Sequence, residues 1–146
     1  MWPSDKFLLG LVSFLTGHVF YISGLHSGIE WTSTGVVWAP LLFFGSGMFW
    51  VLRSGLGKMQ VPVLVYILVI LIMSVLAWER HLQLELPQTL FAACGAILFL
   101  ISDAMLAWNR FRMKFKSAQF FILSTYYVAQ SAIAISMSQV TSRVLS

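Results

Sequence analysis

Long apolar runs alternate with short polar segments along the whole chain. Five runs reach or approach the roughly 20 residues that a helix needs to cross a bilayer. They cover residues 7–25, 35–52, 62–78, 88–108 and 118–137. Membrane barrel strands alternate apolar and polar residues, and these runs do not, so helices satisfy their backbone groups best. The pattern predicts an all-α transmembrane bundle of about five spanning helices, forming one domain over residues 1–146.

The composition strengthens this interpretation. Hydrophobic residues make up 59% of the 146 residues and charged residues 10%, whereas soluble domains are about 25% charged. Residues 7–25 are longer than the apolar core of a signal peptide, and no A-x-A-like cleavage site follows them, so we expect this run to remain as a span. Cys94 is the single cysteine, and the sequence therefore has no disulfide framework.

Lysine and arginine are unevenly divided between the predicted loops. With five spans, the N-terminus and the second and fourth loops share one side of the membrane. That side carries Lys6, Arg53, Lys58, Arg110, Arg112, Lys114 and Lys116, and the opposite side carries Arg80 and Arg143. The positive-inside rule then places the N-terminus in the cytoplasm and the C-terminus outside. We interpret the net charge of +4 as this topological signal, and nucleic acid is not an expected partner.

Ionisable residues within the predicted spans are the first candidates for function, because a charged side chain in the bilayer centre is costly and usually faces the bundle interior. Asp103 lies five residues before Trp108, about 7 to 8 Å from the membrane edge. The small residues Gly95 and Ala96, about two turns earlier, favour close packing of the same helix face. His18 lies deeper in the first run. A packing histidine bonded to a backbone carbonyl is an equally good interpretation of His18 alone.

Other polar residues in the spans extend this cluster. Tyr66 lies at nearly the depth of Asp103, and Tyr126 and Tyr127 precede Gln130 by four and three residues, which brings these side chains to one side of the last helix. Singly, each could do no more than form a hydrogen bond between helices. Together they predict a polar pocket in the centre of the bundle and in the cytoplasmic half, which carries the basic loops. The sequence has no phosphate-binding glycine loop, HExxH, G-x-S-x-G or Cys/His metal cluster, so we expect no cofactor or metal.

Three segments resemble motifs of the lysoplasmalogenase family, also called YhhN-like. Residues 95–107 read GAILFLISDAMLA, similar to the family's G-A-x-L-F-x-x-S-D-x-x-L-A. Residues 126–130 read YYVAQ, similar to Y-Y-x-A-Q, and residues 7–18 are similar to F-x-x-G-L-x-x-F-x-x-x-H, with Tyr21 following. Family members have about eight helices. The resemblance implies that this chain corresponds to the last five, without the preceding helix that carries a Gly-Asp pair.

The resemblance also implies an activity. Lysoplasmalogenases hydrolyse the vinyl ether bond of lysoplasmalogens to a fatty aldehyde and glycerophosphoethanolamine or glycerophosphocholine. A lysophospholipid and the bilayer are then the expected partners, and a bacterial inner membrane is the expected location. Such hydrolysis needs a general acid and a positioned water. Asp103 is the expected acid, with His18 as its catalytic partner. The expected substrate-binding residues are Tyr21, Tyr66, Ser102, Tyr126, Tyr127, Gln130, Arg110 and Arg112.

Two other interpretations of the same residues remain open. A polar cluster within a membrane also marks the path of an ion or solute, so a small multi-pass transporter or a non-enzymatic lipid-binding protein is the alternative. A purely structural role is the third. Release of aldehyde from a lysoplasmalogen separates the enzyme from both.

Overall fold

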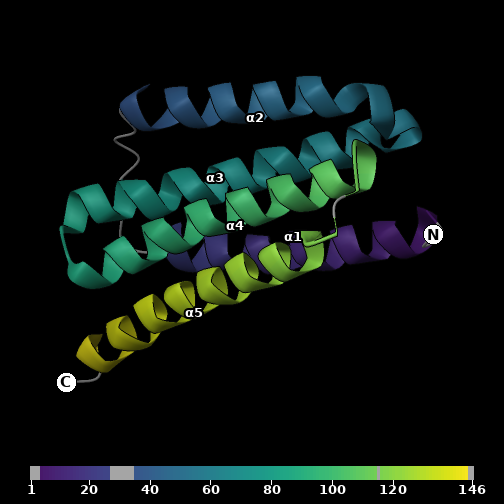
Figure 1. The fold of residues 1–146 in the computed structure, drawn as a ribbon. Coiled ribbons are helices and arrows are strands. Elements are labelled where there is room, and N and C mark those ends of the chain that lie inside the picture. The colour runs from purple at the N-terminus through teal and green to yellow at the C-terminus, as the bar shows by residue number, and fades with distance from the viewer. Residues whose placement is uncertain (1–3, 27–34, 115, 145–146) are drawn as a thin grey trace.

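The computed structural model describes residues 4–26, 35–114 and 116–144, with side chains described over residues 7–26, 35–114 and 116–136. These residues form five α-helices and one short 3-10 turn. The elements are α1 (Ser4–His26), α2 (Gly35–Leu56), η1 (Gly57–Met59), α3 (Gln60–Leu84), α4 (Pro87–Phe111) and α5 (Ala118–Val144). The predicted all-α helical bundle is confirmed (Figure 1).

Four helical runs in the described part of the chain are long and apolar enough to cross a membrane: Phe7–His26, Gly35–Leu84, Pro87–Phe111 and Ala118–Ser136. The second run has 50 residues and folds back on itself at η1, where Gly57 has a φ of +51°. This left-handed conformation suits glycine. The run therefore contains two antiparallel helices, α2 and α3 (Figure 1).

The helices extend further into the polar segments than the hydrophobic pattern predicts. The loop predicted over residues 79–87 is mostly helical, because α3 continues to Leu84. The Arg80 guanidinium donates a hydrogen bond of 3.0 Å to the carbonyl of Leu25 at the end of α1, which fixes a polar residue inside the helix. The left-handed conformation of Glu85 (φ 49°) ends α3, and Pro87 begins α4 at a position that needs no N–H donor.

The helices α3 and α4 form the centre of the bundle. Helix α3 packs against α1, α2 and α4, and α5 packs along α4, as Figure 1 shows. The buried core between them includes Ile70, Met73, Leu76, Ala92, Ala96, Phe99, Ala129 and Ile133. Large apolar side chains such as Phe20 and Phe43 point outward, with 73% and 85% of their surface exposed. This distribution suits a bundle whose surroundings are lipid.

The contact between α4 and α5 depends on Gly95. A Cβ atom at this position would lie 2.9 Å from the Ala129 carbonyl oxygen and 2.8 Å from Cγ1 of Ile133. The two backbones can approach each other only because glycine has no side chain. This close packing fixes the position of α4, the helix that carries Asp103.

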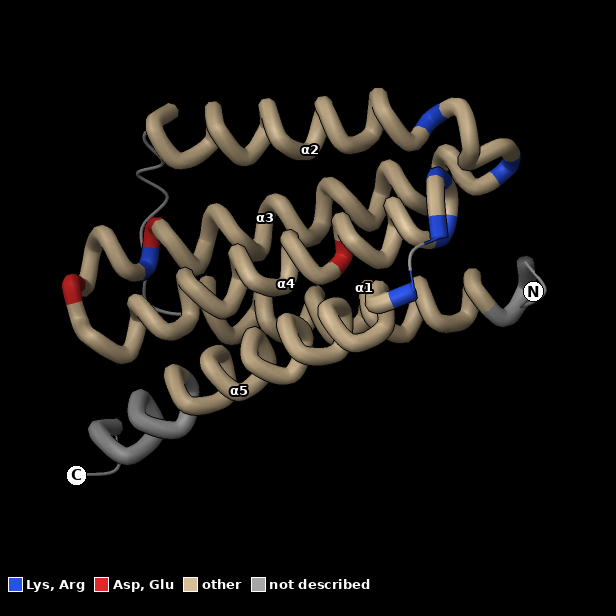
Figure 2. Tube along the Cα trace, viewed as in Figure 1, with Lys and Arg blue, Asp and Glu red and all other residues tan. Residues whose placement is uncertain are grey.

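Basic residues gather at the end of the bundle where α2 turns into α3 and α4 leads into α5 (Figure 2). Helix α4 carries one acidic residue, Asp103, within its length. The fold therefore places a cationic end and an intramembrane carboxyl group along the same helix.

Candidate active site within the helix bundle

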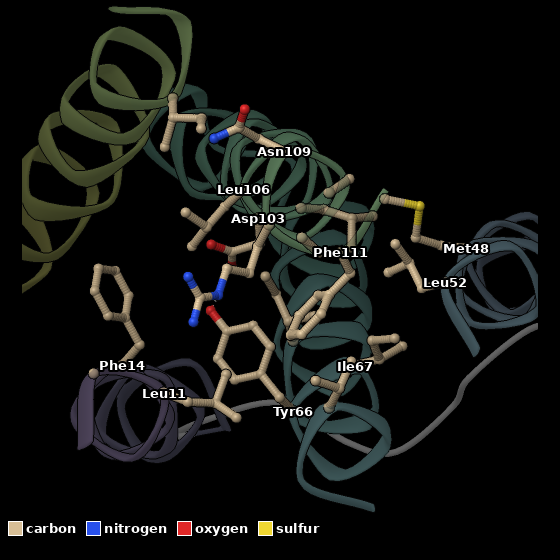
Figure 3. Close-up of a pocket in the computed structure, with 18 of the residues that line it drawn as sticks. Leu11, Phe14, Met48, Leu52, Tyr66, Ile67, Asp103, Leu106, Asn109 and Phe111 are labelled. Carbon is tan, nitrogen blue, oxygen red and sulfur yellow. The ribbon is translucent and has the colours of Figure 1, made fainter. Parts of the chain in front are cut away.

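Asp103 lies at the contact between α3 and α4. Its side chain is buried, with 9% exposed, and the hydroxyl of Tyr66 donates a 2.5 Å hydrogen bond to its Oδ2 atom. Figure 3 shows the two side chains pointing toward each other. The structure thus brings together two residues that the sequence analysis placed at the same depth on different helices. The bond holds one carboxyl oxygen and leaves the other available to a ligand.

His18 approaches the same carboxyl group from α1. Its Nδ1 atom lies 2.7 Å from the carbonyl oxygen of Phe14. A carbonyl oxygen can only accept, so Nδ1 carries the hydrogen, and Nε2 of the neutral ring is an acceptor. Nε2 lies 3.9 Å from Oδ2 of Asp103 and has no hydrogen-bond partner among the described residues. With 2% of its surface exposed, His18 presents a buried, unused acceptor to the carboxyl group.

Aromatic rings fix the position of the imidazole. The rings of Tyr66 and Phe99 both meet it edge to face, with centroids 5.6 and 5.2 Å away. Such contacts restrict rotation of a buried ring. His18 is thus bonded to a backbone carbonyl, as the packing interpretation expects, and it also faces Asp103. Its catalytic role stays a prediction.

A cavity of about 590 Å³ adjoins Asp103 and Tyr66. Its walls are mainly apolar and include Leu11, Ile67 and Leu106 (Figure 3). The polar and charged residues that line it near the end of α4 and the start of α5 are Asn109, Arg110, Lys114 and Gln119. The cavity therefore joins a buried carboxyl group to the cationic end of the bundle.

Arg110 is held at this cavity by aromatic side chains. Its Cζ atom lies 5.2 Å from the centre of the Phe7 ring, and Phe7 meets Phe111 edge to face at 5.4 Å. A guanidinium over an aromatic face is a favourable arrangement, and its planar N–H groups match the geometry of an anion such as phosphate.

A second cavity, of about 440 Å³, lies on the α1 and α5 side of His18. It is lined by Ser13, Phe14, Gly17, His18, Phe20, Tyr21, Phe99, Tyr126 and Gln130. Gln130 donates a 3.3 Å hydrogen bond from Nε2 to the hydroxyl of Tyr21. The Tyr126 ring meets Phe14 and Phe99, each at 5.5 Å. The polar residues predicted to line one pocket are thus divided between two adjacent cavities.

Three of the predicted substrate-binding residues line neither cavity. Tyr127 is 63% exposed on the outside of α5. Ser102 is buried and donates a 3.0 Å hydrogen bond to the carbonyl of Ile122, which joins α4 to α5. Arg112 is exposed, and its guanidinium bonds to Ser54 Oγ at 3.2 Å.

Several lining residues were not predicted from the sequence as site residues. Phe14 could have been predicted from the sequence, because it belongs to the motif over residues 7–18 and precedes His18 by one helical turn. Phe99 could have been predicted in the same way, because it lies in the motif around Asp103. Asn109 and Gln119 carried no signal, since polar residues at helix ends are common. Within the described residues, no three His, Cys, Asp or Glu side chains are grouped to hold a metal ion.

Comparison with known proteins identifies relatives over nearly the whole chain. Residues 1–137 match the YhhN family. Human lysoplasmalogenase TMEM86B is 32% identical over 136 residues, covering 93% of this chain and 55% of the relative. Human lysoplasmalogenase TMEM86A is 32% identical over 143 residues, covering 93% and 58%. The TMEM86B of the pig, Sus scrofa, is 30% identical over 143 residues, covering 95% and 57%.

The chain spans just over half the length of these curated relatives. No solved structure matches it. The family match covers both cavities and the Asp103 cluster, and the chain belongs to the YhhN family.

Proposed function

We propose that the protein hydrolyses the vinyl ether bond of lysoplasmalogens, with Asp103 as the general acid. The observation that carries this proposal is the larger cavity, which is lined by Asp103 and also by Arg110 and Lys114. The relatives are named lysoplasmalogenases, and we take the substrate class of the proposal from these names.

The spacing of the charges suits a lysophospholipid. Asp103 and Arg110 are seven residues apart on α4, about 10 Å along the helix axis. The phosphate and the vinyl ether of the substrate are separated by the three glycerol carbons. A phosphate beside Arg110 and Lys114 would therefore bring the vinyl ether close to Asp103, and charge-assisted hydrogen bonds would hold it there.

Asp103 would start the reaction by donating its proton to the outer carbon of the vinyl group. The positive charge that develops on the carbon and oxygen of the ether then lies beside the new carboxylate, which stabilises it. The Tyr66 bond to Oδ2 would orient the carboxyl group so that its other oxygen faces the substrate.

His18 would act on the water. Because Nδ1 is engaged with Phe14, Nε2 can accept a proton from a water molecule as it attacks the carbon of the oxocarbenium ion. The product is a hemiacetal. Collapse of the hemiacetal returns its hydroxyl proton to Asp103 and transfers the proton on His18 to the glycerol oxygen, which releases the aldehyde and the glycerophospho product. One water is consumed, and both side chains return to their starting states.

Purified protein in detergent or nanodiscs tests the proposal. It should release a fatty aldehyde from a lysoplasmalogen, and the matched lysophospholipid with a saturated alkyl ether should remain intact. In D₂O the aldehyde should carry one deuterium on the carbon next to the carbonyl, because that carbon is the protonated vinyl carbon. No aldehyde from the vinyl ether substrate would contradict the proposal and favour the transporter or lipid-binding alternative.

A further inference from the structure

One face of α1 adjoins open space in both cavities. Gly10 lines the larger cavity and Gly17 the second, and a Cβ atom added to either would have nothing within 4 Å among the described residues. Seven residues separate them, so they share a helix face, with Phe14 between them. Gly45 on α2 also lines the larger cavity, but a Cβ there would lie 2.6 Å from Cδ1 of Leu71. Both cavities therefore leave room beside α1 for a ligand.

The order of residues along α1 sets a direction for a lipid. Phe7 contacts Arg110 at the cationic end. His18 lies eleven residues later, about 16 Å along the helix axis, and faces Asp103. The second cavity extends past this level to Phe20 and Tyr21. A headgroup at Arg110 and a vinyl ether at Asp103 would therefore direct the rest of the hydrocarbon chain toward the second cavity.

The second cavity also reaches the lipid-facing surface. Helix α1 packs against α3, while α5 packs against α4. Side chains connect α1 and α5 across the gap, through the Phe14 and Tyr126 rings and the bond from Gln130 to Tyr21. Phe20, which lines the cavity, is 73% exposed. A chain in this cavity would be in contact with the bilayer.

We propose that the second cavity binds the hydrocarbon chain of the lysophospholipid, which passes sideways between the bilayer and the site through the gap between α1 and α5. The proposal rests on the proposed function for the identity of the ligand, a single-chain phospholipid. Phe14, whose ring meets Tyr126, lines both cavities, so a chain that extends from one cavity to the other would run along it. The aldehyde then leaves into the bilayer through this gap, and the water-soluble glycerophospho product leaves past Arg110 and Lys114.

Photocrosslinking with a substrate analogue tests this placement without requiring turnover. The probe is an alkyl ether lysophosphoethanolamine with a diazirine near the free end of its chain, which the enzyme cannot cleave. In the unmutated protein in nanodiscs, the label should fall on peptides that contain residues 13–21 of α1 or 126–130 of α5. Excess unlabelled lysophospholipid should compete for it. Label on α2 and α3, at Met48, Ile67 or Ile70 of the larger cavity, would overturn the proposal, as would the absence of competed label.

Matched glycine variants add a second readout. Gly17→Leu places a side chain in the second cavity and should reduce the competed label about tenfold, the loss of roughly two methylene contacts. Gly47→Leu is the control, since Gly47 is exposed on α2, lines neither cavity and also has nothing within 4 Å of an added Cβ. If Gly17→Leu leaves the labelling unchanged, the probe binds only at the lipid-facing surface and not in the second cavity, which would contradict the proposal.

A parallel aldehyde assay separates the two proposals. Label at α1 and α5 without aldehyde release would refute the reaction and retain the chain site. Aldehyde release with label on α2 would refute the chain site and retain the reaction.

Discussion

Tyr66 and Asp103, which are 37 positions apart in the sequence, share a buried hydrogen bond of 2.5 Å between α3 and α4. The bond has two consequences. It satisfies one oxygen of a carboxyl group that lies within the membrane, where an unsatisfied polar group is costly. It also fixes the orientation of that group toward the larger cavity.

Tyr66→Phe should lower kcat and leave KM nearly unchanged. Asp103 can still donate its proton, but its carboxyl group is no longer held in one orientation. We expect a loss of about fivefold in kcat, since one such bond is worth roughly 1 kcal/mol. Kinetics of aldehyde release measure it. Tyr127→Phe is the matched control, because Tyr127 lies on the exposed side of α5. Equal effects of the two substitutions would show that the Tyr66 hydroxyl has no special role.

His18→Gln should lower kcat by at least about a hundredfold, the lower range for general base catalysis. Glutamine can still accept a hydrogen bond from water, but it cannot take the proton. The measurement is single-turnover aldehyde release by protein whose thermal unfolding matches the unmutated form. A loss below tenfold would assign His18 to the positioning of water.

The structure separates two arginines that the sequence treated alike. Arg110 and Lys114 line the cavity, whereas Arg112 bonds to Ser54 outside it. Arg110→Gln combined with Lys114→Gln should therefore raise KM about tenfold or more with little change in kcat, because phosphate binding is lost equally in the ground and transition states. Arg112→Gln should leave KM unchanged. The same rise in KM for Arg112→Gln would place the phosphate elsewhere.

The hydrophobic pattern was sufficient to predict the bundle, because spanning helices need long apolar runs. It placed helix ends too early wherever a polar residue continues a helix, as Arg80 does through its bond to Leu25. The insertion cost of Asp103 identified the centre of the candidate site, and depth along each helix selected Tyr66. Sequence position could not distinguish Tyr126 from Tyr127, since neighbouring residues on a helix point about 100° apart and the packing of α5 decides which one faces inward.

The topology remains a prediction from the charges. A reporter fused after Lys116 should be cytoplasmic, and one fused after Ser146 external, because basic residues are seven to two in favour of that side. Paired cytoplasmic and external reporters at each position measure this. The opposite result would place Arg110 and Lys114 outside the cell, and the headgroup would then reach the site from the external leaflet.

We propose above all that Asp103 donates the proton that cleaves the vinyl ether. Asparagine keeps the shape of the side chain and can accept the Tyr66 bond, but it has no acidic proton. The decisive measurement is the rate of aldehyde release from a lysoplasmalogen by Asp103→Asn protein that inserts and unfolds like the unmutated form. We expect a loss of at least about a hundredfold, and full activity in correctly inserted protein would contradict the assignment.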